Sequence, residues 1–266
     1  MIIDAHVHTF PDAIAGKALH KLEVISGLTR VTDGTVSGTA EFMKEQKIDK
    51  FINLNIATAP GQQHTINTTA AENNKQYSDM ISLGSVHPEN PEAVRELYRI
   101  KALGIKGIKL HPDYQEFFID EKRLYPIYEA CSLLELPIVF HAGWDCYSPD
   151  VVHAVPAASA KVAADFPKLK MVLAHFGGLH LWEDVETYLT GMENVYFDTA
   201  MAATYMQSSA TAMKLLNRHP IENIFLGSDC PWELPCRSIA FVESLPISDD
   251  RKEKILGGNA AAFYGL

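Results

Sequence analysis

The sequence predicts an α/β protein of the (β/α)8, or TIM, barrel type, and three observations support this fold class. The chain has 266 residues, close to the roughly 250 that such a barrel uses. Eight apolar runs of strand length recur along it, separated by stretches in which apolar residues have helical spacing. Strands that alternate with helices form parallel sheets, and eight such units close a barrel. We therefore expect one domain over residues 1–266.

The expected strands cover residues 2–8, 51–55, 81–86, 105–110, 137–141, 171–175, 195–198 and 224–228. The expected helices cover 38–47, 62–77, 91–103, 121–135, 156–166, 181–190 and 204–218, with a last one at 249–263. The Gly-rich segment 9–36 interrupts this alternation. We interpret it as an elaborated loop after the first strand, placed where it could lie over a site.

Composition and charge narrow the class of protein. Hydrophobic residues make up 47% and charged residues 21%, which is ordinary for a chain with a large core. The formal charge of -10, with scattered Lys and Arg, argues against a nucleic-acid partner. The amino-terminal residues do not resemble a secretory signal, and no apolar run approaches the roughly 20 residues of a membrane span. We expect a soluble cytoplasmic protein whose cysteines are reduced thiols, at positions Cys131, Cys146, Cys230 and Cys236.

Histidine and aspartate residues stand at the ends of several expected strands. His6 and His8 are two apart, so they face the same side of the first strand. His141 ends the fifth strand, His175 ends the sixth, and Asp229 follows the eighth. The carboxyl ends of barrel strands meet at one rim, where active sites of this fold are built. Independent structural histidines have no reason to gather there, so the sequence predicts a metal site.

Each of these residues also has a structural interpretation. A single histidine at a strand end is more often a hydrogen-bonded rim residue than a ligand. Asp229 follows a Gly-Ser turn and could cap the next helix. Asp4 could orient a ligand or could be a buried structural acid. As a set, however, imidazoles and a carboxylate suit zinc, manganese or iron, and they leave an open position for water.

The motifs together resemble the amidohydrolase superfamily, and most closely its amidohydrolase-2 branch of decarboxylases, hydratases and hydrolases, which includes aminocarboxymuconate-semialdehyde decarboxylase. The resemblance spans nearly the whole chain, through DAHVH at 4–8, SVHPENP at 85–91, GIKGIKLHP at 104–112, FHAG at 140–143, AHFGG at 174–178, GSDCPW at 227–232 and the terminal GGNAAAFYGL. It implies that one divalent ion, zinc in the first place with manganese or iron as alternatives, is held by His6, His8, His141 and Asp229. It also implies that His175 is a nearby catalytic histidine.

The leading hypothesis is a metal-dependent hydrolase that attacks a small amide, ester or lactone with a metal-activated water. Asp229 would accept the water proton, and His175 would stabilise the oxyanion or protonate the leaving group. The alternative is a non-oxidative decarboxylase or hydratase acting on a small unsaturated or aromatic acid. A barrel nuclease with a similar first strand fits the acidic chain poorly, and a barrel that binds a metal and ligand without turnover stays open.

The loops after the strands should form the pocket for a small-molecule substrate. Lys109 ends the fourth strand, where some superfamily members carry a carboxylated lysine between two metals. We interpret it as a substrate-facing cation or a local structural charge, with the carboxylated bridge as the alternative. His111 precedes a proline and could face substrate or simply be held in a rigid turn, and Arg237 is suited to a substrate carboxylate. A homodimer is expected only because such assemblies are common. The further pocket candidates are Trp144, Asp145, Tyr147 and Trp232.

Overall fold

The computed structural model describes residues 1–206 and 208–266, and its strands lie within the expected runs or within one residue of them. These strands are β1 (Ile3–Val7), β2 (Lys50–Leu54), β3 (Met80–Leu83), β4 (Ile108–Leu110), β5 (Ile138–Phe140), β6 (Met171–Leu173), β7 (Val195–Asp198) and β8 (Ile224–Phe225). Several are shorter than predicted, because the chain leaves the regular ladder before the polar residues that follow each apolar run.

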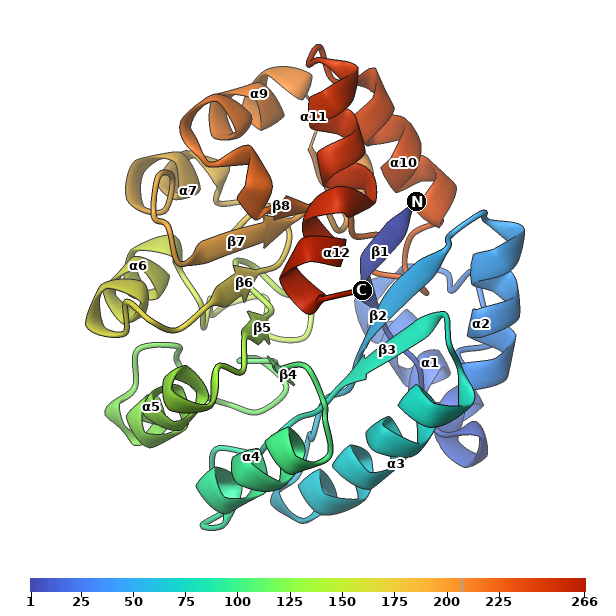
Figure 1. Cartoon of the computed structure of the whole chain (residues 1–266), viewed down its shortest axis with the longest axis vertical. Helices are drawn as coiled ribbons and strands as arrows, with labels where there is room; N and C mark the ends of the chain where they lie inside the picture. The colour runs from blue at the N-terminus through green and yellow to red at the C-terminus, as the bar shows by residue number, and fades with distance from the viewer. Residues whose placement is uncertain (207) are drawn as a thin grey trace.

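The strands close into a parallel barrel (Figure 1). Strands β1 to β3 pair in sequence order, and so do β4 to β8. A bridge between Gly84 and Ile108 joins β3 to β4, and a bridge between Val7 and Cys230 joins β1 to the segment after β8. The predicted (β/α)8 fold is therefore confirmed, and the carboxyl ends of all strands meet at one rim.

Helices surround the barrel (Figure 1), and most of them match the expected ranges. They are α2 (Val36–Glu45), η1 (Pro60–Gln62), α3 (Gln63–Gln76), α4 (Ala93–Ala102), η2 (Lys122–Leu124), α5 (Tyr125–Leu134), α6 (Pro156–Asp165), α7 (Trp182–Tyr188), α8 (Ala202–Tyr205), α9 (Ser209–Arg218) and η3 (Ile221–Asn223). The expected last helix is divided into α11 (Asp249–Glu253), the π-helical η4 (Lys254–Gly258) and α12 (Asn259–Tyr264). None of the described helices is long and apolar enough to cross a membrane.

Two of the described α-helices were not expected. The segment 9–36 contains α1 (Asp12–Ser26), so its interpretation as a loop is wrong over those residues. This helix buries Ala15 and Leu19, and it ends at Gly27, whose φ of +69° favours glycine. The second is α10 (Pro235–Ser244), which follows β8 and has a proline in its first turn.

Successive strand residues point to opposite sides of the barrel wall. Val139 and Val172 share one buried cluster with Phe225 of β8 and Tyr264 of α12. Phe140, the residue after Val139, belongs instead to the cluster formed with the surrounding helices. Figure 1 shows α12 lying across the centre of the barrel. Because α12 packs against the interior at the amino-terminal end of the strands, the opposite rim is the end left for a site.

Candidate functional site

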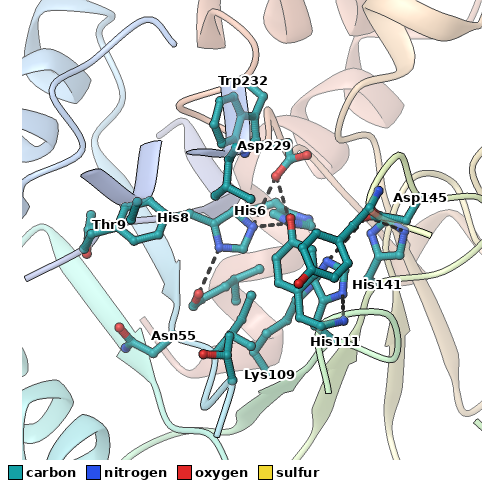
Figure 2. A pocket seen from close by; sticks show the side chains of 18 of the residues that line it. His6, His8, Thr9, Asn55, Lys109, His111, His141, Asp145, Asp229 and Trp232 are labelled. Carbon is teal, nitrogen blue, oxygen red and sulfur yellow. Dashed lines mark hydrogen bonds and ion pairs between the residues drawn. The ribbon is translucent and has the colours of Figure 1, made fainter. Parts of the chain in front are cut away.

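A cavity of about 630 Å³ opens at the carboxyl-end rim (Figure 2). His6, His8, His141, His175 and Asp229 all line it. Side chains from β1 and from the segments after β5, β6 and β8 therefore come together, as the strand-end pattern predicts. The amino-acid types at these positions are metal ligands, so their protonation and spacing decide what the site can bind.

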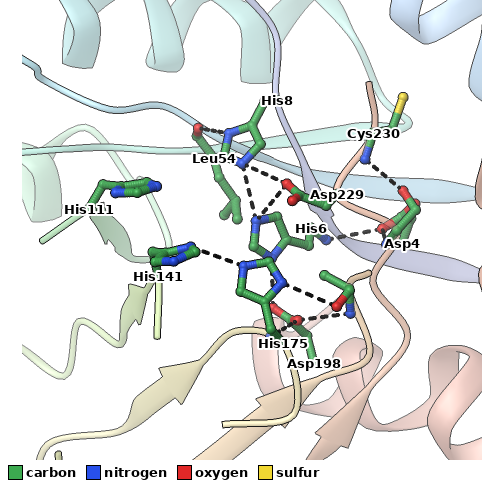
Figure 3. Close-up of polar contacts among 12 residues, drawn as sticks. Asp4, His6, His8, Leu54, His111, His141, His175, Asp198, Asp229 and Cys230 are labelled. Carbon is green, nitrogen blue, oxygen red and sulfur yellow. Dashed lines mark hydrogen bonds and ion pairs between the residues drawn. The ribbon is translucent and has the colours of Figure 1, made fainter. Parts of the chain in front are cut away.

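Hydrogen bonds fix the imidazoles of His6 in β1 and of His8 directly after it on their Nδ1 side (Figure 3). His6 Nδ1–H donates to Asp198 Oδ2 at 2.8 Å, and His8 Nδ1–H donates to the Leu54 carbonyl at 3.0 Å. In the neutral rings, Nε2 is then the nitrogen that carries the free lone pair. These two nitrogens lie 3.1 Å apart, and they lie 3.3 Å and 3.2 Å from Asp229 Oδ1. The Nε2 atoms of two neutral rings and a carboxylate oxygen at this spacing can together coordinate a cation.

His141 and His175 are fixed in the same way from their outer sides. His175 Nδ1–H donates to the Ala200 carbonyl at 3.2 Å, and His141 Nε2–H donates to the Trp144 carbonyl at 3.3 Å. The free nitrogens, His141 Nδ1 and His175 Nε2, face each other at 3.0 Å. Burial lowers the pKa of His175 to about 4 and also lowers that of His141, so both rings are neutral at pH 7.

The donor set fits a divalent metal ion. Ligand atoms about 2.0–2.2 Å from one ion lie about 3 Å from each other, as the three atoms of His6, His8 and Asp229 do. One ligand atom each from His6, His175 and Asp229 also lie within 4.8 Å of one another. His141 Nδ1 lies 3.0 Å from His175 Nε2, so either of these two imidazoles could complete the ligand set.

Two of the rim residues have an unusual backbone conformation. His175 and Asp229 have φ values of 60° and 68°, in the left-handed region that residues other than glycine seldom adopt. Such a residue costs about 1–3 kcal/mol and persists only where its surroundings fix the conformation. Here the Asp229 N–H donates to the His6 carbonyl at 2.9 Å, and the His175 N–H donates to Asp198 Oδ1 at 3.0 Å. The backbone of the rim is therefore held by the same residues that orient its side chains.

Asp198 is a site residue that the sequence reasoning missed. It is fully buried at the end of β7, and its two oxygens accept hydrogen bonds from the His6 ring and from the backbone N–H groups of His175 and Ala200. Burial raises the pKa of this carboxyl group, and the neighbouring His175 opposes the rise. The strand sequence VYFD carried a signal, because it places an acid at the same rim as the histidines.

Asp4 supports the backbone of the site. Its Oδ1 accepts hydrogen bonds from the backbone N–H groups of His6 at 3.1 Å and Ser228 at 3.0 Å, and its Oδ2 accepts one from the Ser228 hydroxyl. The register of β1 shifts between Asp4 and Val7. Figure 3 shows Asp4 on the side of Cys230, away from the imidazoles. It therefore ties β1 to the segment that carries Asp229.

A second group of potential ligands adjoins the first. His111, His141 and Asp145 each offer one ligand atom, and these atoms lie within 4.8 Å of one another. The His111 ring stacks on His141 with centroids 4.5 Å apart, and Asp145 Oδ2 lies 3.4 Å from His141 Nε2. Burial raises the pKa of Asp145 to about 6. The stacking ring and the carboxylate orient His141 so that its Nδ1 faces His175.

The pocket residues proposed from the sequence divide into two sets. Lys109, His111, Trp144 and Trp232 line the cavity, as do Asp145 and Tyr147. Arg237 does not line it, because it is exposed in the first turn of α10. The structure thus does not bring Arg237 to the site.

Lys109 is a buried cationic residue that lines the cavity. Its side chain is fully buried, and its Nζ has no hydrogen-bond partner among the residues that the structure describes. Burial lowers its pKa to about 8, although Asp198, Asp229 and Asp145 act against this shift.

The four cysteines are all free, and Cys146 also lines the cavity.

A parallel barrel with imidazoles and carboxylates gathered at its carboxyl-end rim defines the class of metal-dependent barrel enzymes. The chain belongs to the amidohydrolase family, whose model matches residues 3–266. The family expected from the motifs is therefore confirmed.

Two curated relatives are similar over part of their length. The chain is 24% identical over 225 residues to a 2-keto-4-carboxy-3-hexenedioate hydratase of Sphingobium sp., and the aligned region covers 66% of this chain and 63% of the relative. It is 25% identical over 232 residues to a 2-amino-3-carboxymuconate-6-semialdehyde decarboxylase of Dictyostelium discoideum, and the aligned region covers 74% of this chain and 63% of the relative. The chain thus spans 63% of the length of each relative. These relatives do not support the predicted hydrolase, and their activities are those of the alternative prediction.

The fold also resembles a solved 5-carboxyvanillate decarboxylase of Novosphingobium aromaticivorans, complexed with manganese and 4-hydroxy-3-methoxy-5-nitrobenzoic acid. The TM-score is 0.75 with 16% sequence identity, and the match covers 100% of this chain and 96% of that one. A divalent metal is thus present in a structural neighbour, as manganese and not as the zinc expected first.

Proposed function

We propose that this chain is a metal-dependent lyase, a non-oxidative decarboxylase or a hydratase, that acts on a small unsaturated or aromatic carboxylic acid. The observation that carries the proposal is that a set of metal-ligand atoms lines the same cavity as the buried Lys109, whose Nζ has no hydrogen-bond partner among the described residues. An electron-rich donor set calls for a cation, and an unpaired buried cation calls for an anion. A substrate that carries a carboxylate satisfies the second requirement. The hydratase and decarboxylase activities of the relatives agree with this choice.

His6, His8, His141 and Asp229 would hold one divalent ion, through His6 Nε2, His8 Nε2, His141 Nδ1 and an Asp229 oxygen. When bound, such an ion polarises a substrate oxygen and lowers the pKa of bound water towards about 7. Manganese, zinc and iron all suit imidazole and carboxylate ligands. Asp198 supports the set, because its carboxylate fixes the His6 ring with Nε2 turned inwards.

Lys109 would bind the carboxylate of the substrate. Its pKa of about 8 leaves it mostly protonated at pH 7, and it lies at the cavity wall with no other hydrogen-bond acceptor in reach among the described residues. A charge-assisted hydrogen bond in a buried site is stronger than one between neutral groups. The lysine therefore selects acids and fixes their orientation at the rim.

His175 would move the proton. Its Nδ1–H is committed to the Ala200 carbonyl, so its Nε2 can accept a proton from a substrate hydroxyl or from water. In decarboxylation, His175 then returns that proton to the carbon that has lost carbon dioxide, so the proton count is balanced. In hydration, the proton taken from water returns to the carbon next to the one that gains the hydroxyl group. Asp229 is the second acid and base within reach of the same position.

The test is a product assay on the metal-loaded chain. Carboxyl-13C-labelled hydroxybenzoates and unsaturated dicarboxylates are supplied beside a panel of lactones, esters and amides. We expect release of labelled carbon dioxide, or addition of water, from at least one acid and no hydrolysis. Replacing His175 with Asn should lower the rate at least about 100-fold while the metal content by mass spectrometry stays unchanged.

A matched control is His180→Asn, because this nearby histidine does not line the cavity. It should leave the rate within a factor of two of wild type. Turnover of a lactone, ester or amide without any reaction of the acids would contradict the lyase and restore the hydrolase.

A further inference from the structure

We propose that the substrate carries an extended, uncharged and largely apolar tail, which lies in an arm of the cavity between α1 and α3. The inference rests on the proposed function, because it places the reacting acid at the rim beside Lys109. The cavity volume of about 630 Å³ is about four times the ~150 Å³ of a cavity that holds benzene. An acid with a single ring at the rim therefore leaves most of the space unfilled.

One wall of the arm is an apolar face of α1. The cavity-lining residues of this helix that are apolar lie four, four and three positions apart, which places them on one face, and they are Ile14, Ala18, Leu22 and Ile25. The helix buries a different strip, made by Ala15 and Leu19. Ile14 remains 51% exposed. The helix thus carries apolar surface that the fold does not bury, and this surface bounds the same cavity as the proposed reacting centre.

The other wall is a neutral face of α3. Thr65, Thr69 and Asn73 are spaced by four residues and line the cavity together with Ile66. Their hydroxyl and amide groups can bind an ether or carbonyl oxygen, but they carry no charge. Both carboxylates among the lining residues lie at the rim, and Lys21 of α1 is exposed, with its Nζ 5.8 Å from the centroid of the Tyr147 ring after β5. The arm therefore excludes a cationic tail and fits an alkyl, alkoxy or acyl chain with few neutral polar groups.

The position of the arm explains why this occupant is part of the substrate. His6 and His8 line the same cavity as both helices, so a molecule can reach from the rim into the arm without crossing a protein wall. Apolar surface beside a reacting centre gives binding energy to the part of a substrate that does not react. The chain length of the tail should then control affinity.

The experiment measures binding of benzoate, 4-butoxybenzoate and 4-hexyloxybenzoate to the metal-loaded chain by titration calorimetry. Each methylene group that enters the arm should increase affinity by up to about fourfold. Ala18→Phe fills the arm from α1 and Thr69→Phe fills it from α3, so each should remove this gain and leave benzoate binding unchanged. Ala13→Phe is the matched control, because Ala13 is exposed on α1 and does not line the cavity. It should keep the gain.

Equal affinities along the series, no binding of any member, or a gain that persists in both filled variants would overturn the inference. Circular dichroism shows that each variant is folded. Metal content and release of labelled carbon dioxide are measured on the same preparations. Lyase activity without an effect of chain length refutes the arm alone, whereas an effect of chain length without lyase activity refutes the proposed function alone.

Discussion

Replacing Lys109 with Met should stabilise the fold and weaken the binding of acids. The Lys109 side chain is fully buried, its Nζ has no partner among the described residues, and burial lowers its pKa from 10.5 to about 8. A shift of this size means that the charge costs the folded state on the order of 3 kcal/mol at pH 7. A typical domain is stable by only about 5–15 kcal/mol, so the gain is measurable. Met has a similar length and needs no partner.

The sign of the pH dependence follows from the same shift. Below pH 8 both the folded and the unfolded chain hold the proton, so the full cost of the buried charge is present. Between pH 8 and 10.5 the unfolded chain binds more protons, and the free energy of unfolding of the wild type rises with pH. Lys109→Met should be more stable at pH 7 by up to about 3 kcal/mol and should lack Lys109's contribution to this rise.

Urea unfolding of the metal-free protein at pH 7 and pH 9.5 measures both effects. Lys106→Met is the control, because the Lys106 Nζ donates to the carbonyls of Tyr264 and Gly265 and its loss should cost about 1 kcal/mol. In the metal-loaded enzyme, Lys109→Met should raise KM for the acid substrate. A Lys109→Met protein that is less stable than wild type at pH 7 would refute the interpretation of Lys109 as an uncompensated charge.

Three further predictions concern the supporting residues. Burial lowers the pKa of His219 to about 4, and its Nδ1 accepts a hydrogen bond from the backbone N–H of Gly191. The free energy of unfolding should therefore fall on the order of 3 kcal/mol as pH drops from 6.5 to 4. His219→Gln should remove that loss, which urea unfolding at pH 4.5 and 7 measures. Asp198→Asn should weaken metal binding about 10- to 100-fold in competition with a chelator, and unchanged affinity would contradict its orienting role. Gly143 has a φ of +87°, and an added Cβ would lie 2.1 Å from a backbone nitrogen; Gly143→Ala should therefore cost more than about 1 kcal/mol in thermal unfolding, and a neutral effect would contradict this close approach.

The barrel and the residue types at its rim could be predicted because both depend on local sequence. A strand in a parallel barrel is a short apolar run, and the residue after that run stands at the rim whatever the rest of the chain does. The period of two placed His6 and His8 on one side of β1 without knowledge of any partner strand. His141, His175 and Asp229 followed from the ends of their runs alone.

The unexpected helix α1 lacked the local signals that identify a helix. The N-cap position of α1 is Pro11, which makes no side-chain capping bond, and the helix contains Gly16. Its buried strip consists of Ala15 and Leu19, and several of its other apolar residues line the cavity, so the helix has no single apolar face. Arg237 was misplaced for a related reason: once Pro235 begins α10, the arginine lies in the first helical turn and is exposed.

The protonation of the site could not be predicted, because it is decided by bonds between residues far apart in the chain. His6 turns its Nε2 inwards because Asp198 takes its Nδ1 proton, across 192 positions of sequence, and His8 does so because it donates to the Leu54 carbonyl, 46 positions away. With either proton on the other nitrogen, a ring would offer an N–H to the centre and repel a cation. A list of strand-end histidines is therefore compatible with a metal centre or with an ordinary hydrogen-bonded rim. The outer acceptors favour the metal centre, because they turn the Nε2 lone pairs of the neutral His6 and His8 rings towards Asp229.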